Sequence, residues 1–121
     1  MPKECFGTAG VPLSPAVRAG DFVYVSGQVP AGPDGRVVEG GIEAETRQVL
    51  ENVRSVLELA GCTLDDVVKT TAWLRDREDF AAFNEAYGEF FPTNPPARST
   101  VESRLMIDIA VEIEAIAFSP R

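Results

Sequence analysis

The sequence has no histidine among its 121 residues. Histidine is the commonest protein ligand for metals and the usual general base near neutral pH. The two cysteines, Cys5 and Cys62, have no CxxC spacing and no metal-ligating neighbours. We interpret Cys62 as a small buried residue. The sequence therefore predicts no metal site.

Long hydrophobic runs are also missing. No stretch of about 18 apolar residues, the minimum for a membrane-spanning helix, occurs in the chain. The N-terminus has no basic segment followed by an apolar run. We therefore expect a cytoplasmic protein without a signal peptide or membrane span.

Basic residues are few and scattered. Eleven Lys and Arg residues face 19 Asp and Glu residues, which gives a net charge of −8. A chain this acidic repels polyphosphate, so we expect no nucleic-acid partner. A small anionic substrate would meet the same repulsion and would need a local cation in its pocket.

What is present is typical of one soluble globular domain. Apolar residues make up 45% of the chain and charged residues 25%. We see no repeat, linker or low-complexity segment. A chain of this length can bury a full core, and we expect residues 1–121 to form a single domain.

Two segments have apolar residues at the three- and four-residue steps of a helix. The first lies between Gly41 and Gly61, and its apolar face consists of Ile42, Val49, Val53, Val56 or Leu57, and Ala60, with Thr46 at the missing step. The second starts near Asp76, a candidate N-cap, and stops before Pro92. Its stripe consists of Phe80, Phe83, Tyr87, Phe90 and Phe91. We interpret this aromatic stripe as core and not as a cofactor site.

β-branched and aromatic residues predict the strands. The expected strands are residues 22–26, 67–74, 98–102 and 110–118, with an edge strand near 11–17 and a hairpin or wide loop around the turn at 33–35. In the strand 67–74 we expect one apolar side made by Val68, Ala72 and Leu74. This order of elements favours an α+β fold, in which both helices pack on one face of a mixed sheet.

Two helices leave the other sheet face uncovered. On a monomer, one set of alternating side chains would then be exposed. This set is either Val23, Val25, Val67 and Trp73 or the residues next to them, which point to the opposite face. A large bare apolar face predicts self-association.

Arg98 and Glu112 are the candidate site residues. Arg98 follows Pro95 and Pro96 and opens a strand, where its planar guanidinium can hold a carboxylate through two hydrogen bonds. Glu112 lies on the last strand, where it could handle a water molecule. The alternatives are that Arg98 is a surface charge or an ion-pair partner. Glu114, on the same strand face, either raises the pKa of Glu112 or is a surface charge.

Several segments resemble the RidA (YjgF/YER057c/UK114) family, in order along nearly the whole chain. They are Tyr24–Pro30 (YVSGQVP), residues 51–53 (ENV), 60–61 (AG), 67–71 (VVKTT), 83–87 (FNEAY), 96–101 (PARSTV) and 112–117 (EIEAIA). The resemblance implies a chorismate-mutase-like (bacillus type) α+β fold. It also implies a homotrimer with three ligand clefts between subunits and no metal or organic cofactor.

The resemblance also implies an activity. Members that have the arginine of the PARS segment hydrolyse reactive 2-imino or 2-enamino acids, such as 2-aminoacrylate, to a 2-keto acid and ammonia. By matching position, Arg98 would bind the substrate carboxylate and Glu112 would orient or activate water. Ser26, Gly27 and Asn84 would line the same cleft, and the backbone at Thr100 would touch the ligand.

The chain departs from the family pattern at two positions. Ala16, in Ser14-Pro15-Ala16, stands where the best-studied deaminases have a tyrosine, which implies a different or larger substrate. Thr100 replaces a frequent cysteine. The alternatives to a deaminase are a trimer that binds a small carboxylic acid without catalysis, or a chaperone-like protein. A ribonuclease, described for some members, is the weakest alternative because of the negative charge and the missing histidine.

Overall fold

A computed structural model describes residues 2–121. The elements are β1 (Glu4–Phe6), β2 (Ala16–Ala19), β3 (Phe22–Gln28), α1 (Gly41–Leu59), β4 (Val67–Leu74), α2 (Phe80–Phe90), β5 (Ala97–Glu102) and β6 (Val111–Phe118), with short 3₁₀ turns at Leu64–Asp66 and Arg77–Asp79. Both predicted helices and four of the predicted strands are confirmed, with ends shifted by one or two residues for most.

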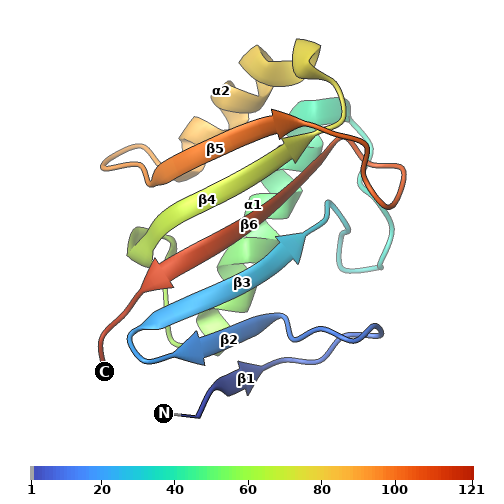
Figure 1. Cartoon of the computed structure of the whole chain (residues 1–121). Coiled ribbons are helices and arrows are strands. Elements are labelled where there is room, and N and C mark those ends of the chain that lie inside the picture. Colours follow the sequence, from blue (N-terminus) through green and yellow to red (C-terminus); the bar gives the residue numbers. More distant parts are fainter. Residues whose placement is uncertain (1) are drawn as a thin grey trace.

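Over residues 2–121 the strands form one six-stranded sheet in the order β1-β2-β3-β6-β4-β5 (Figure 1). β4 and β5 are parallel and are joined through α2, whereas the other neighbouring strands are antiparallel. The sheet is therefore mixed, as predicted. β5 lies at one edge and continues the sheet beyond β4.

Both helices lie behind the sheet in Figure 1 and cover the same face. The core between them is built mainly from Val23, Val25, Val49, Leu50, Val53, Leu57, Ala72, Leu74, Phe83, Val111, Ile113 and Ala115. The carboxylate of Glu45, on α1, is buried here and accepts a hydrogen bond of 2.7 Å from the amide of Ala110. α1 is thereby tied to the start of β6, and Gly61, at φ 76°, turns the chain away after the helix.

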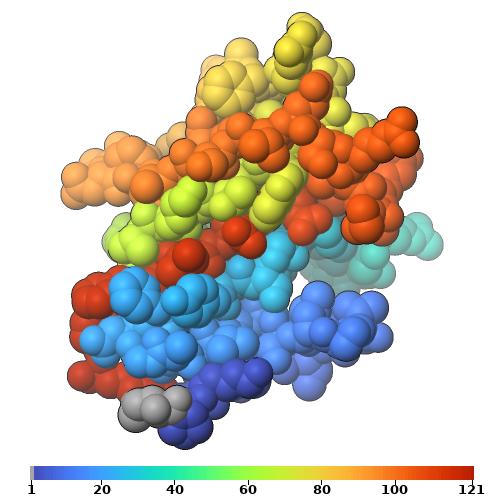
Figure 2. All heavy atoms as spheres, viewed as in Figure 1, coloured from blue at the N-terminus to red at the C-terminus, as the bar shows by residue number. Residues whose placement is uncertain are grey.

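The opposite face of the sheet points toward the viewer in Figure 2. Tyr24 is 45% exposed there, and Phe22 and Phe118 meet edge to face with ring centroids 5.2 Å apart. No helix among residues 2–121 covers this face. The uncovered face of the sheet is therefore the one to which Tyr24 and Trp73 point, whereas Val23, Val25 and Val67 are buried under the helices.

Two strand predictions are wrong in detail. Residues 11–15 form bends and irregular backbone and not an edge strand, because Pro12 and Pro15 cannot donate to a ladder. The edge is made by β1, which was not predicted, and β2 lies beside it. Val68 is 44% exposed because a bulge between Val67 and Lys69 reverses the alternation at the start of β4. Thr70, Ala72 and Leu74 form the buried side instead.

Arg18 is buried without a carboxylate partner in the described part of the chain. Its guanidinium donates to the carbonyl oxygens of Ser119 at 2.7 Å, and of Gly20 and Ala60 at 3.4 Å each. One side chain thus joins β2, the end of α1 and the C-terminal residues.

Candidate functional site

Arg98 lies on the helix-covered side of the edge strand β5. Its partner in the parallel ladder is Thr70, which is 1% exposed and faces the core, so the Arg98 side chain projects toward α2. The Arg98 Cζ atom lies 5.7, 5.2 and 4.8 Å from the ring centroids of Phe80, Phe83 and Tyr87. These distances are those of cation–π contacts. We call these three rings the aromatic cradle.

No ion pair or side-chain hydrogen bond from Arg98 occurs within residues 2–121. The side chain is half-buried, and it borders a hollow of about 420 Å³ that is also lined by Tyr87, Gly88, Phe91, Pro95 and Pro96. Its donors therefore remain available to a ligand. The expected alternative of a structural ion pair finds no support in the described residues.

The aromatic stripe of α2 is only partly core. Phe83 and Tyr87 are buried, but Phe80 is 44% exposed and lies beside Arg98. The Tyr87 hydroxyl is 2.7 Å from Thr70 Oγ1. Burial raises the pKa of Tyr87, and the hydrogen bond to Thr70 and the Arg98 charge oppose that shift.

Asn84 and Thr100 lie on the same side as Arg98. Thr100 is two residues further along β5, and Asn84 is on α2 within one turn of Phe80 and Tyr87. Asn84 Oδ1 and Thr100 Oγ1 are both buried, and neither has a hydrogen-bond partner among the described residues. Such orphaned polar atoms are uncommon in native structures.

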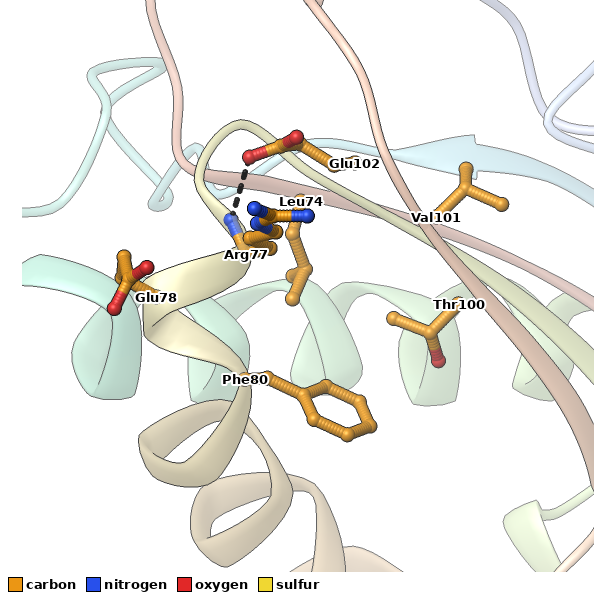
Figure 3. A pocket seen from close by; sticks show the side chains of 7 residues that line it. All are labelled: Leu74, Arg77, Glu78, Phe80, Thr100, Val101 and Glu102. Carbon is orange, nitrogen blue, oxygen red and sulfur yellow. Dashed lines mark hydrogen bonds between the residues drawn. The ribbon is translucent and has the colours of Figure 1, made fainter.

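A hollow of about 430 Å³ lies between β5 and the beginning of α2 (Figure 3). It is lined by Leu74, Arg77, Glu78, Phe80, Thr100, Val101 and Glu102. In Figure 3 the Phe80 ring points from α2 toward Thr100, and the Glu102 carboxylate accepts a hydrogen bond of 2.9 Å from the backbone N–H of Arg77. Phe80 therefore contributes to both the cradle and this hollow.

Glu112 lies on the open face of the sheet. Glu112 on β6 pairs with Trp73 on β4 and points to the same face of the sheet. Trp73 is three residues from Thr70, so Trp73 and Thr70 point to opposite faces. A methyl group added at Gly27 would collide with Glu112 Oε2 and lie 3.0 Å from its Cδ, which shows how closely the carboxylate packs against that glycine. Ser26, in the same bulged end of β3, donates a hydrogen bond of 2.7 Å to the carbonyl of Ser14.

The environment of Glu112 favours its neutral form. Burial raises the pKa of this carboxyl above its ordinary value, and the charge of Glu114 raises it further. A carboxyl with a raised pKa is a stronger base when it is ionised, which is the property that a general base needs.

The predicted residues therefore form two groups. Arg98, Asn84 and Thr100 lie on the helix side near the β5 edge, and Ser26, Gly27 and Glu112 lie on the open face. A single chain does not bring Arg98 and Glu112 together. The sequence analysis did not assign the aromatic cradle to a site. The signal that could have indicated it is that the three rings lie on the helix directly before the strand that carries Arg98.

Ala16 lies next to the Ser26 end of β3, where the backbone N–H of Ser26 donates to the carbonyl of Pro15. It is fully buried in the hydrophobic core and pairs with Val25 across β2 and β3. The Ala16 side chain faces the core and lines no cleft of the single chain, and the different or larger substrate stays a prediction.

Residues 2–121 contain no group of three His, Cys, Asp or Glu side chains placed to hold a metal ion. No helix in that range is both long and apolar enough to cross a membrane.

Comparison with known proteins places the chain in a family. A family model described as "Endoribonuclease L-PSP" matches residues 7–119. A RutC family protein of Pyrococcus horikoshii is 50% identical over 109 residues, which cover 88% of this chain and 86% of that protein. The structure of YyfA, a Rid family protein of Yersinia pestis, is 42% identical with a TM-score of 0.92, covering 97% of this chain and 99% of that one.

A third similar protein was crystallised with a ligand. It is TdcF of E. coli with bound serine, which is 35% identical with a TM-score of 0.89 and covers 95% of this chain and 98% of that one. Both the sequence match and the shared fold extend over almost the full length of the chain. The chain therefore belongs to the RidA (YjgF) family, whose model carries the endoribonuclease L-PSP description.

Proposed function

We propose that the protein is a deaminase that hydrolyses 2-imino or 2-enamino acids to 2-keto acids and ammonia. The observation that carries the proposal is Arg98: a half-buried arginine that is held by three rings and has no acid partner within residues 2–121. In a chain of net charge −8, such a free cation is what an anionic substrate requires. Arg98 binds the substrate carboxylate through two parallel hydrogen bonds.

Glu112 activates the water. The C=N carbon of an iminium is electrophilic, so water adds to it when a base takes the water proton. The ionised Glu112 accepts that proton and passes it to the nitrogen of the carbinolamine. The C–N bond then breaks and releases ammonia, while the hydroxyl oxygen forms the C=O bond and gives its proton to Glu112, which releases it to solvent. Its raised pKa, caused first by burial and then by Glu114, suits this exchange.

The two groups of residues meet between subunits. Because Arg98 and Glu112 lie on opposite faces of one sheet, a complete site needs Arg98 from one copy and Glu112 from another. The exposed aromatic face and the edge strand β5 provide surfaces for that assembly. We propose a homotrimer with three such clefts.

The other predicted residues complete the cleft. Asn84 and Thr100 lie on the same side of the sheet as Arg98, and each has a buried side-chain oxygen, Oδ1 and Oγ1, without a hydrogen-bond partner within residues 2–121. Gly27 leaves room for the Glu112 carboxylate, and Ser26 holds the neighbouring loop through Ser14. Serine, which is bound to TdcF, is a small molecule with a nitrogen on the carbon next to its carboxylate, and a 2-imino acid has its nitrogen at the same position.

The test is a coupled assay in which an amino-acid oxidase generates a panel of imino acids and the rate of their hydrolysis is followed. We expect the wild-type protein to accelerate hydrolysis, and we expect Arg98→Ala and Glu112→Gln to be defective. Arg36→Ala, a change at an exposed arginine in the 29–38 loop, is the matched control and should keep full activity. Carboxylate binding without any acceleration would overturn the deaminase and favour the alternative of a non-catalytic binder.

A further inference from the structure

We propose that Tyr87 is a positioning residue: anchored through its hydroxyl to Thr70, its ring holds the Arg98 guanidinium in place and leaves hydrogen-bond donors for the substrate carboxylate. The inference rests on the proposed carboxylate-binding role of Arg98. It concerns how that arginine is aimed, not the chemistry at the reacting atoms.

Three residues from three elements form a closed triangle. Thr70 on β4 and Arg98 on β5 are direct partners in the parallel ladder. Thr70 Oγ1 lies 2.7 Å from the Tyr87 hydroxyl, and the Tyr87 ring centroid lies 4.8 Å from Arg98 Cζ, the shortest of the three cradle distances. The strand register, one hydrogen bond and one ring contact therefore place Arg98 relative to α2.

The cradle holds Arg98 through ring contacts at its Cζ atom and not through hydrogen bonds. A guanidinium has five N–H donors, and a cation–π contact pairs none of them with an oxygen or nitrogen acceptor. A carboxylate neighbour would also fix the side chain, but it would occupy the donors. Rings in place of an acid stabilise the charge and keep the donors free, which fits the absence of an Arg98 ion pair in the described residues.

The Tyr87 ring has little freedom of its own. Phe83 and Phe91 flank it with ring centroids 5.5 and 4.9 Å away, and Tyr87 is 6% exposed. Within this packing the hydroxyl bond to Thr70 fixes the depth and tilt of the ring. Without the hydroxyl the Tyr87 ring would adopt a different position, and the Arg98 guanidinium in contact with it would move as well.

The test measures the affinity for 2-oxobutanoate, a small 2-keto acid, by titration calorimetry. Tyr87→Leu, which removes the ring, should raise Kd about tenfold, the size expected for a desolvated cation–π contact. Tyr87→Phe, which keeps the ring and loses the anchor, should raise Kd by about threefold. In steady-state hydrolysis the same variants should change KM by similar factors with kcat nearly constant.

Two comparisons separate positioning from a structural effect. In an Arg98→Ala background, Tyr87→Leu should have no further effect on Kd, because the residue acts only through the arginine. The double variant Thr70→Val/Tyr87→Phe removes both hydroxyls and leaves neither unpaired, so its Tm should return toward wild type while Kd stays raised. Recovery of Kd together with Tm would overturn the inference.

Phe90→Leu is the matched control. Phe90 is on the same helix, and its ring lies 5.3 Å from Cζ of a different arginine, Arg54, so its loss should not change Kd. Additive effects of Tyr87→Leu and Arg98→Ala would overturn the positioning role even if imino acids are hydrolysed. If the protein binds the keto acid through Arg98 but hydrolyses no imino acid, the proposed deaminase activity is overturned. The positioning role of Tyr87 is then decided by whether the effects of Tyr87→Leu and Arg98→Ala on Kd are additive. If the wild-type protein binds no keto acid, both proposals fail.

Discussion

Arg98 and Glu112 project from opposite faces of one sheet, although β4 alone separates their strands. Arg98 pairs with Thr70 and Glu112 pairs with Trp73 on the two sides of that strand, and positions three residues apart in a strand point in opposite directions. The distance between the two groups within one chain is therefore fixed by the sheet and cannot be closed by side-chain rotation.

Mixing two inactive variants should restore activity. If each cleft takes Arg98 from one subunit and Glu112 from the next, Arg98→Ala and Glu112→Gln subunits complement each other. After random reassembly of a 1:1 mixture, about a quarter of the clefts contain both intact residues, since each residue is intact in half of the subunits. We expect about a quarter of the wild-type hydrolysis rate. A rate equal to the mean of the two separate variants would show that the cleft does not lie between subunits.

Arg98→Ala should reduce kcat/KM strongly. The substitution removes a charge and two hydrogen bonds, and a hydrogen bond to a charged group contributes about 1.5–3 kcal/mol, so a loss of roughly tenfold to several hundredfold is expected. Arg98→Lys keeps the charge without the planar fork and should recover only part of the loss.

The melting curve of the same preparations provides the control. Arg98 has no ion pair within residues 2–121, but Arg98→Ala removes its three ring contacts, so Tm should fall moderately while the loss of activity persists per folded molecule. A lowered Tm with full activity per folded molecule would instead identify Arg98 as a structural residue.

The pH profile should report Glu112. A general base must be ionised, so kcat/KM should fall as the pH falls through the raised pKa of Glu112, above the usual range for a glutamate. Glu114→Gln removes the second cause of the shift and should move this acid limb to lower pH, although burial, the larger cause, remains. An acid limb unchanged in both Glu114→Gln and Glu112→Asp would assign it to another group.

The stability of the folded protein should change over the pH range in which Glu112 titrates, in the direction opposite to the change in activity. Because folding raises this pKa, the folded state favours the protonated carboxyl, and that contribution is lost as the pH rises through the folded-state pKa. Glu112→Gln should therefore raise Tm at neutral pH and lose this advantage in acid. Equal shifts of Tm at both pH values would contradict the raised pKa.

Gly27→Ala should disable the site without unfolding the chain. The added methyl group would collide with the end of the flexible Glu112 side chain, so the carboxylate must move while the backbone can stay. We expect kcat to fall at least tenfold, with a small change in Tm. Gly10→Ala, at a position with no heavy atom within 4 Å of the new methyl group, is the control and should behave as wild type.

Much of the fold could be predicted because local patterns agree with the final packing. The periodic apolar residues of α1 and the β-branched runs of β4 and β6 identify their elements without tertiary information. The exposure of Val68 could not be predicted, since a bulge depends on how β4 pairs with β6. The short β1 strand forms only because β2 offers it an edge.

The candidate residues could be named from the sequence, mainly through the family resemblance, but their arrangement could not. The sheet face that Arg98 and Glu112 each occupy follows from the strand order, in which β6 lies between β3 and β4. The role of Phe80 was hidden because a ring at helical spacing usually belongs to the core. Only the parallel pairing of Thr70 with Arg98 shows that the arginine meets that helix.

The three carbonyl contacts of Arg18 have a consequence for how the protein opens. A buried guanidinium that loses one acceptor leaves charged donors unsatisfied, so release of the C-terminal residues at Ser119 weakens the hold on Ala60 and Gly20 as well. The first strands, the end of α1 and the last residues should therefore behave as one cooperative unit in native-state hydrogen exchange. In most small domains the chain ends fray independently; here the amides of β2 and the C-terminal end of β6 should exchange with a common opening free energy.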